Sequence, residues 1–168
     1  SGILLAGLWA AGETSVTEPE PTRDHTERML RAFGYDVKTE GNRISLQGGG
    51  KLVGTEIQVP SDISSAAFFM VGAAITEGSD VTLEAVGINP TRTGVIEILK
   101  QMGADITVEN ERIAGGEPIA DIRIQGTRTL KGIHMPEDQV PLAIDEFPAL
   151  FIAAACAEGQ TVLTGAAE

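Results

Sequence analysis

The chain has 168 residues, of which 42% are hydrophobic and 21% charged, a composition typical of one ordinary globular domain or two small lobes. Its formal net charge of −12 argues against nucleic acid and acidic membrane surfaces as partners. No apolar run reaches the roughly 18 residues that a membrane helix needs, and no basic-then-apolar signal segment opens the chain. The single cysteine, Cys156, has no partner for an internal disulfide, and we expect it to be a small buried hydrophobe in a cytoplasmic protein.

A pattern of about 65–70 residues recurs along the chain. Its first copy predicts a helix at 3–11 and a strand at 14–18. A Pro-Thr-Arg turn at 21–23 then precedes a second helix, which ends before a strand at 36–40. Alternation of apolar and polar residues predicts a further strand at 44–46.

The segment between the first two copies carries three further expectations. Three consecutive glycines at 48–50 predict a flexible hairpin tip, and they lack the Lys-Ser/Thr context of a phosphate-binding loop. Alternation at 56–59 predicts another strand. Asp62 or Ser64 is placed to cap the apolar helix that follows.

The second copy repeats the order of the first. It predicts a helix at 66–76, a strand at 80–84, and a helix that follows the Pro-Thr-Arg segment at 90–92. Strands are predicted after that helix, at 105–109 and at 121–124.

A third copy begins with a helix at 149–157 and a strand at 161–164. Each copy therefore follows the order βαβαββ approximately, and the third copy stops in mid-unit. The predicted fold class is α/β (α+β), built from repeated units that are incomplete in this chain.

Helix ends and helix faces also follow from the pattern. Asp24 and Glu27 have the spacing of a capping box, and residues 89–90 (Asn-Pro) resemble a cap followed by a first helical residue. Gly34 and Gly103 are predicted to end helices in the left-handed conformation. Two apolar helix faces are predicted: Thr26, Met29, Leu30 and Phe33 in one helix, and Val95, Ile98, Leu99 and Met102 in another.

Asp145 is the most informative candidate residue. It lies in the segment 144–148, between two apolar runs, where a carboxylate is costly unless it is paired, capping or catalytic. On the local pattern, Asp145 is either the N-cap of a helix whose first turn contains Pro148, or a group that carries chemistry.

Arg23 and His25 open a predicted helix, where free N–H groups attract anions and an arginine offers a bidentate fork to phosphate or carboxylate. The alternative is a solvated surface on which Arg23 pairs with Glu20 or Glu27 and His25 is an ordinary helix residue. The two histidines, His25 and His134, have no metal-ligand spacing with Cys156, so no metal site is predicted.

Four segments together resemble the 5-enolpyruvylshikimate-3-phosphate synthase family. They are residues 18–34, 59–69, 89–94 and 144–148, and they occur in the family's order over essentially the whole chain. The resemblance implies a two-lobed fold of βαβαββ units with the active site in the cleft between the lobes. It assigns residues 1–60 to one lobe and 61–168 to the other.

The resemblance also implies the activity, which is transfer of the enolpyruvyl group of phosphoenolpyruvate to the 5-hydroxyl of shikimate 3-phosphate, with release of phosphate. Asp145 matches a catalytic aspartate that binds the shikimate hydroxyls and transfers protons. Arg23 matches an arginine that contacts shikimate 3-phosphate in one branch of the family. The family needs no metal or cofactor, and we expect the intact enzyme to be a cytoplasmic monomer. Because other family motifs are absent, we expect this chain to be an internal fragment that is inactive alone.

Two alternatives stay open. The first alternative is that the chain is a non-enzymatic module or natural split half that needs a complementary chain. It is motivated by the unfinished last unit and the open edges of the predicted sheets. The other alternative is transfer of enolpyruvate to UDP-N-acetylglucosamine, because that group of enzymes shares the fold.

Overall fold

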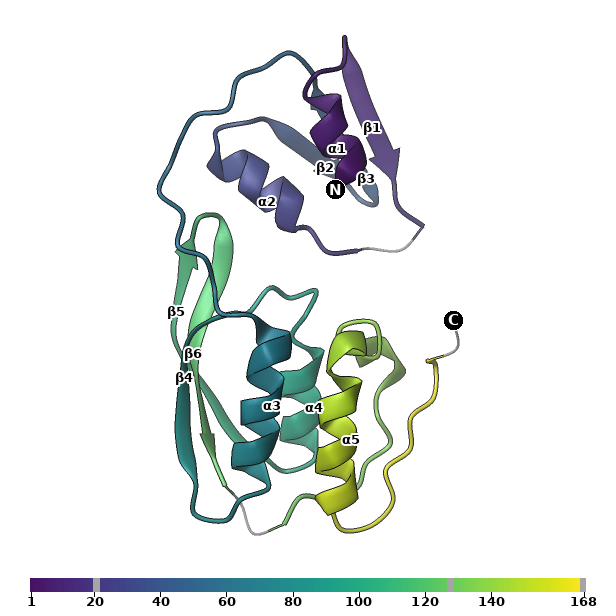
Figure 1. The fold of residues 1–168 in the computed structure, drawn as a ribbon. Coiled ribbons are helices and arrows are strands. Elements are labelled where there is room, and N and C mark those ends of the chain that lie inside the picture. Colours follow the sequence, from purple (N-terminus) through teal and green to yellow (C-terminus); the bar gives the residue numbers. More distant parts are fainter. Residues whose placement is uncertain (20–21, 127–128, 167–168) are drawn as a thin grey trace. The chain divides into compact units, whose positions relative to one another are not determined.

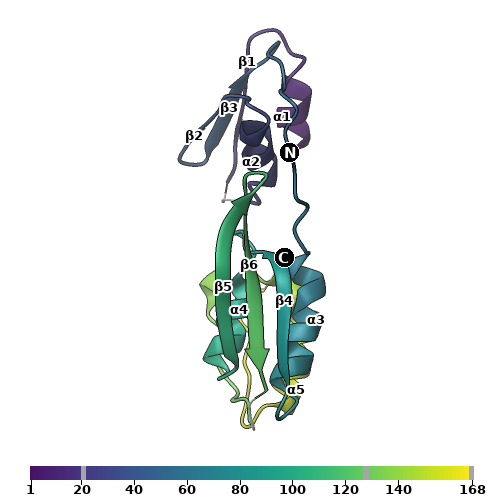
Figure 2. The same ribbon diagram turned by 90° about the vertical axis from the view of Figure 1, so that its left-hand side faces the viewer.

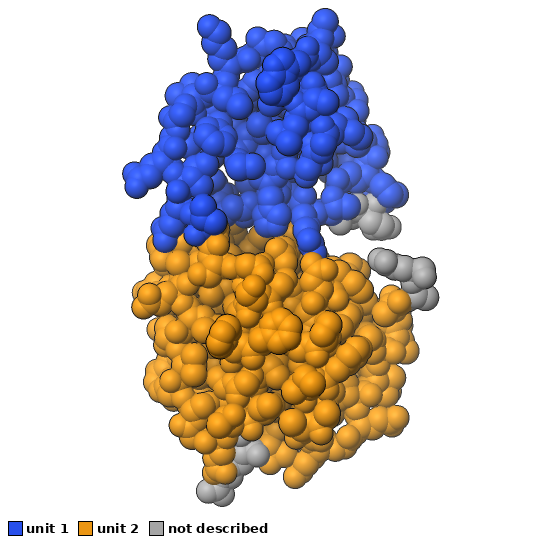
Figure 3. All heavy atoms as spheres, in the orientation of Figure 1, with its two compact units in different colours: residues 1–59, 113–117 blue, residues 60–112, 118–168 orange. Residues whose placement is uncertain are grey.

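The computed structural model describes residues 1–19, 22–126 and 129–166. The chain divides into two compact units (Figure 3): the first comprises Ser1–Val59 and Ile113–Glu117, and the second comprises Pro60–Arg112 and Pro118–Glu168. The assignment of residues 1–60 and 61–168 to two lobes of a larger enzyme stays a prediction. The grouping of 113–117 with the first unit was not anticipated from the sequence.

The first unit packs two helices on a three-stranded sheet (Figure 1). Its elements are α1 (Gly2–Gly7), β1 (Glu13–Thr17), α2 (His25–Ala32), β2 (Val37–Glu40) and β3 (Arg43–Gln47). The strands are antiparallel in the order β1-β3-β2. Ile44 and Leu46 alternate with polar residues along β3, so both enter the core. There they join Leu4 of α1, Leu8 at the end of that helix and Leu30 of α2.

The three-glycine segment after β3 is not the predicted hairpin tip, because no strand follows it within residues 48–60. Instead, the N–H groups of Gly48 and Gly49 donate to the carbonyls of Gly12 and Leu8, each at 2.9 Å. A Cβ on Gly48 would lie 2.1 Å from the carbonyl oxygen of Ala10. Glycine is required here because the backbone that joins α1 to β1 passes directly against the turn.

The predicted strand at 56–59 is wrong. These residues have no strand partner and no regular structure, and the Val59 side chain is 82% exposed. The alternating pattern suits a strand, but a strand needs a neighbour that accepts and donates its backbone hydrogen bonds. No strand of either sheet pairs with these residues, so they remain an irregular connection between β3 and α3.

The helices of the second unit lie on one side of a second sheet, and the last of them packs against the other two (Figures 1 and 2). Its helices and strands are α3 (Ile63–Ala74), β4 (Asp80–Gly87), α4 (Gly94–Gln101), β5 (Asp105–Ala114), β6 (Glu117–Gln125) and α5 (Phe147–Cys156), with short 3₁₀ turns η1 (Glu137–Gln139) and η2 (Ile144–Glu146). The sheet order is β4-β6-β5, and β4 pairs antiparallel with β6. The predicted α/β fold class is confirmed.

The predicted apolar face is confirmed for the helix of the second unit and is partly wrong for the helix of the first unit. Val95, Ile98, Leu99 and Met102 of the α4 segment are fully buried, as predicted. On α2, the buried residues are Thr26, Glu27 and Leu30, whereas Met29 is 41% exposed. The inclusion of Met29 in the core face is therefore wrong. The buried face of α2 runs instead through Thr26, Glu27 and Leu30, with Leu30 four residues after Thr26 and three after Glu27.

The C-terminal segment corrects two further predictions. Residues 161–164 form no strand and make a single parallel bridge, between His134 and Val162. Cys156 is exposed, not buried, because α5 buries Phe147, Leu150 and Ala153 while its last residue faces outward. A helix that is apolar on all sides gives no sign of which side will be covered.

Helix termini are partly as predicted. Gly34 and Gly103 follow helices with φ angles of 74° and 92°, which confirms the left-handed caps. The capping box is wrong, because the Asp24 side chain makes no capping bond and instead accepts from Arg28 Nε at 2.8 Å. Among the described residues, no helix has both the length and the apolar composition needed to cross a membrane.

Candidate functional site

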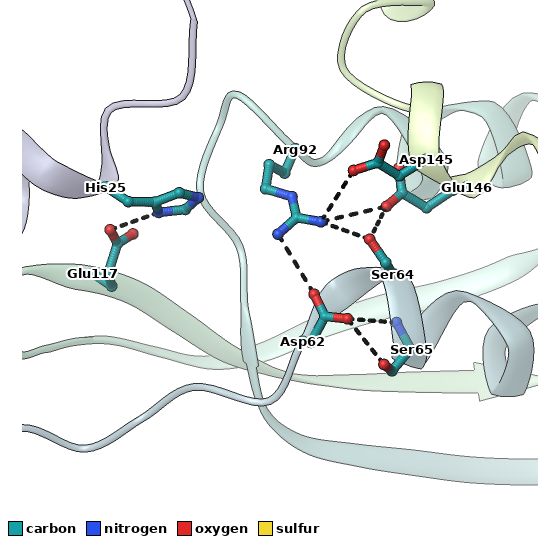
Figure 4. A network of polar contacts seen from close by, with 8 residues as sticks. All are labelled: His25, Asp62, Ser64, Ser65, Arg92, Glu117, Asp145 and Glu146. Atoms are coloured by element: carbon teal, nitrogen blue, oxygen red, sulfur yellow. Dashed lines mark hydrogen bonds and ion pairs between the residues drawn. The ribbon is translucent and has the colours of Figure 1, made fainter. Parts of the chain in front are cut away.

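The second unit gathers five polar residues at the beginnings of its three helices (Figure 4). We call this group the Arg92 cluster; it consists of Asp62, Ser64, Arg92, Asp145 and Glu146. Asp62 and Ser64 begin α3, Arg92 precedes α4, and Asp145 and Glu146 form the turn η2 before α5. Because a helix N-terminus carries a partial positive charge, carboxylates are stabilised at this end of the unit.

Arg92 is the centre of the cluster, and its side chain is only 19% exposed. Its Nη2 donates to Ser64 Oγ at 2.6 Å and lies 3.7 Å from both Asp145 Oδ2 and Glu146 Oε1. Its Nη1 lies 3.5 Å from Asp62 Oδ1. One guanidinium therefore faces three carboxylates, which leaves the cluster with a formal charge of −2 when all are ionised.

The turn that presents Arg92 does not form as predicted. Helix α4 begins at Gly94 with Thr93 at its N-cap position, so Asn89-Pro90 do not start the helix. Asn89 is 2% exposed, and its Oδ1 accepts from the backbone N–H of Thr91 at 2.9 Å. The Arg92 N–H donates to the Asn89 carbonyl at 2.8 Å. These bonds fold residues 89–93 into a tight turn that directs Arg92 toward α3.

Asp62 caps α3, which confirms one of the two predicted caps. Its Oδ2 accepts from the Ser65 N–H and the Ser65 Oγ, each at 2.9 Å. Burial raises the pKa of the Asp62 carboxyl, but hydrogen bonds from Ser65 and Ser64 and the charge of Arg92 together outweigh burial and lower that pKa below its ordinary value. Asp62 is therefore a structural carboxylate that stays ionised at neutral pH.

Replacing Asp62 with Ala should lower the free energy of unfolding by about 1 kcal/mol at pH 7, because α3 loses its N-cap. Asp62→Asn should keep most of the cap. Since the pKa of Asp62 is lower in the folded chain, the stability from its charge is present above the unfolded pKa and is lost as the pH falls through the folded pKa. The difference between the parent and Asp62→Asn, measured by urea unfolding, should therefore shrink below about pH 4. If the difference in free energy of unfolding between the parent and Asp62→Asn were the same at pH 7 and pH 3, this assignment would be contradicted. The control is Asp138→Asn, at an exposed position.

Glu146 is the buried carboxylate of the cluster, with 3% of its surface exposed. It accepts a hydrogen bond from Ser64 Oγ and faces Arg92 Nη2 at 3.7 Å. A buried carboxylate without such partners would be strongly destabilising. Ser64 accepts from Arg92 and donates to Glu146, so it links the two charged groups and ties η2 to α3.

Asp145 is exposed like Asp62, with 46% of its side chain accessible against 49% for Asp62. The N-cap position of α5 is Glu146, not Asp145, and the Glu146 side chain makes no capping bond. The capping interpretation of Asp145 is therefore wrong. Pro148 does lie in the first turn of α5, as predicted. Asp145 combines an accessible carboxylate with a position at three helix N-termini, which suits a group that meets a polar ligand.

Arg23 and His25 belong to the first unit, so they are described apart from Asp145. Arg23 is exposed and lies two residues before the start of α2. His25 begins that helix, and its Nδ1 lies 2.8 Å from Glu117 Oε1 (Figure 4), so it is not merely a solvated helix residue. The suggested partner Glu20 lies outside the described residues.

A pocket of about 400 Å³ also borders Asp62, between α3 and β4. Phe69 and Glu84 line it, but Arg92 and Asp145 do not, so the pocket is not the candidate site. In the part of the chain that the structure describes, no group of three or more His, Cys, Asp or Glu side chains is arranged to hold a metal ion.

The comparisons with known proteins decide the family. The family model described as EPSP synthase (3-phosphoshikimate 1-carboxyvinyltransferase) matches residues 1–168. The chain belongs to the EPSP synthase family. Among the relatives, it is 68% identical to the 3-phosphoshikimate 1-carboxyvinyltransferase of Alkalilimnicola ehrlichii and 70% identical to that of Methylococcus capsulatus, over 168 residues in each case.

Solved structures agree with this membership. The EPSP synthase of Acinetobacter baumannii is 94% identical, with a TM-score of 0.96 over the whole chain. The enolpyruvyl transferase NikO of Streptomyces tendae, at 19% identity and a TM-score of 0.71 over 95% of this chain, shows the shared fold alone. The chain spans only 37% of the A. ehrlichii enzyme and 38% of the A. baumannii chain.

Sequence reasoning missed Arg92 and Glu146 as site residues, although both lie within segments that carry the family resemblance. The Pro-Thr-Arg pattern occurs at 21–23 and again at 90–92. Only the first occurrence carries a predicted anion site. The repetition itself is a signal, because each of the two arginines lies two residues before a helix.

Proposed function

We propose that this chain forms part of an enzyme that transfers the enolpyruvyl group of phosphoenolpyruvate to the 5-hydroxyl of shikimate 3-phosphate and releases phosphate. The observation that carries the proposal is the exposed Asp145 carboxylate, placed by the Arg92 cluster at three helix N-termini in a chain that matches the family over its whole length. The activity is a proposal because the chain spans about two fifths of its relatives.

The chemistry needs a base for the attacking hydroxyl and an acid for the vinyl carbon. The oxygen of the 5-hydroxyl bonds to the enolpyruvyl carbon that carries phosphate, and the C–O bond to phosphate breaks. We assign Asp145 to binding the shikimate hydroxyls and to proton transfer, because its side chain is 46% accessible and its Oδ2 lies 3.7 Å from Arg92 Nη2.

The substrates are anionic, so the site must also present cations to their phosphate and carboxylate groups. We assign Arg23 to shikimate 3-phosphate, because it is exposed just before α2, where free N–H groups and a guanidinium attract the same anion. No cofactor enters this proposal, and a cytoplasmic monomer remains the expected state of the whole enzyme.

The test is a chimera in which this chain replaces the matching region of the A. baumannii enzyme, which is 94% identical to it. The chimera should release phosphate from phosphoenolpyruvate only when shikimate 3-phosphate is present. The 168-residue chain alone should give no turnover, since it spans 38% of that enzyme. Phosphate release is measured in both samples.

Two results would overturn the proposal. A folded chimera that is inactive with shikimate 3-phosphate would contradict the assignment, and activity with UDP-N-acetylglucosamine instead would support the nucleotide-sugar reaction. Turnover by the purified 168-residue chain would contradict the need for the rest of the enzyme. Mixing the chain with the remaining segments of the A. baumannii enzyme distinguishes a natural split half from an inactive internal fragment. Activity should return on mixing only if the chain is a split half.

A further inference from the structure

Arg92 is engaged by protein groups, which distinguishes it from an arginine that binds a substrate anion. Both of its terminal nitrogens face carboxylates or Ser64, and its side chain is only 19% exposed. Three carboxylates surround it, so an incoming phosphate would meet repulsion rather than an open guanidinium. Arg92 must therefore act on the site through its neighbours.

The turn η2 transmits this action. Glu146 is buried and bound by Ser64 of α3, and Asp145 is the preceding residue in the same three-residue turn. Glu146 N–H also donates to the Ala143 carbonyl at 2.9 Å. Because the turn is so short, any displacement of Glu146 would displace Asp145 as well.

A second anchor holds the segment that leads into η2. Gly94, the first residue of α4, would place an added Cβ 2.9 Å from Ala143 Cβ and from the carbonyl oxygen of Gln139. Its N–H lies 3.3 Å from the Leu142 carbonyl oxygen. The segment 139–143 is thus pressed against α4, while Glu146 is tied to α3. Asp145 extends from this doubly anchored turn.

We propose that Arg92 and Glu146, linked by Ser64, are positioning residues that hold the Asp145 carboxylate in the orientation that proton transfer requires. This inference rests on the proposed function of Asp145. Arg92 Nη2 lies 3.7 Å from Asp145 Oδ2, and 46% of the Asp145 side chain is accessible. Lysine would replace Arg92 poorly. The planar guanidinium of Arg92 reaches Asp62, Ser64 and Asp145 at once, whereas a single ammonium group cannot.

The test compares Arg92→Met with Arg123→Met in the chimera. Arg123 is the matched control, since it forms a bidentate ion pair with Asp80 at 2.8 and 2.6 Å on strands β6 and β4 and contacts no member of the cluster. Arg92→Met should lower kcat about twentyfold, because a misplaced catalytic group loses rate, while KM for phosphoenolpyruvate, which Asp145 is not assigned to bind, changes less than about threefold. Arg92→Lys should recover part of kcat, and Arg123→Met should keep kcat within about twofold.

If Arg92 had a purely structural role, Arg92→Met would lower the stability of the chimera without lowering kcat selectively over KM. An unchanged kcat in folded Arg92→Met would overturn the inference, as would an equal loss in Arg123→Met. If Arg92→Met does not fold, Ser64→Ala and Glu146→Gln should show the same loss of kcat.

A readout without activity separates this inference from the proposed function. In the 168-residue chain, the Glu146 amide hydrogen should exchange about tenfold faster in Arg92→Met than in the parent, because the turn loses its anchor. Arg123→Met should leave that exchange unchanged. Faster exchange with an inactive parent chimera would refute the proposed function alone, whereas unchanged exchange would refute the positioning role.

Discussion

Asp145→Asn should lower kcat of the chimera about a hundredfold or more, because the amide has the shape of the carboxylate but cannot take up the proton from the attacking hydroxyl. The loss should appear in kcat, measured as steady-state phosphate release with both substrates at saturation. Thermal stability should change little, since the Asp145 side chain is 46% exposed and its ion pair with Arg92 is long, at 3.7 Å.

The matched control for this change is Asp138→Asn. Asp138 is an exposed carboxylate in η1 of the same unit and contacts no member of the Arg92 cluster. Its replacement should leave kcat unchanged. A folded Asp145→Asn chimera with the parent kcat would exclude proton transfer by Asp145 and leave it a surface residue of the cluster.

Arg23→Ala should weaken the binding of shikimate 3-phosphate by about a hundredfold, because a bidentate guanidinium–phosphate contact consists of two charge-assisted hydrogen bonds. KM for phosphoenolpyruvate should change less than about threefold, since the assigned contact is to the other substrate. Arg23→Lys should fall between the parent and Arg23→Ala, because lysine keeps the charge but loses the fork. Titration calorimetry with shikimate 3-phosphate measures the loss directly.

Arg43→Ala is the control in the same unit. Arg43 lies on β3 and pairs with Glu13 of β1 at 2.9 Å, so its removal tests the loss of one exposed arginine without touching α2. Binding of shikimate 3-phosphate to this variant should match the parent. A loss of stability in Arg23→Ala with unchanged binding would contradict the phosphate assignment.

The local pattern predicted those features that depend on neighbours within one or two helical turns. The buried face of α4, from Val95 to Met102, follows from residues three and four apart. The positive φ angles at Gly34 and Gly103 follow from the need to end a helix without a Cβ clash. Asp62 caps α3 through a residue three positions away.

The candidate site was predicted in part for the same reason. Asp145 was identified from its place between two apolar runs and from the family resemblance, and its carboxylate is accessible as a ligand-binding group must be. Its partners were not predicted, because Ser64 and Glu146 are 82 residues apart in the chain and Arg92 lies 28 residues from Ser64. Only packing of α3 against η2 and α4 brings them together.

By itself, the sequence determined the fold class, the repeated order of helices and strands, and the family, and it proposed one carboxylate of the candidate site. The tertiary structure decided that residues 56–59 pair with no strand, that Cys156 faces outward, and that Arg92 is enclosed by three carboxylates. The physical reason is that helix periodicity and caps are set by residues close in the chain. Strand pairing, burial of one side of an apolar helix and the convergence of charges instead depend on which distant segments occupy the neighbouring space.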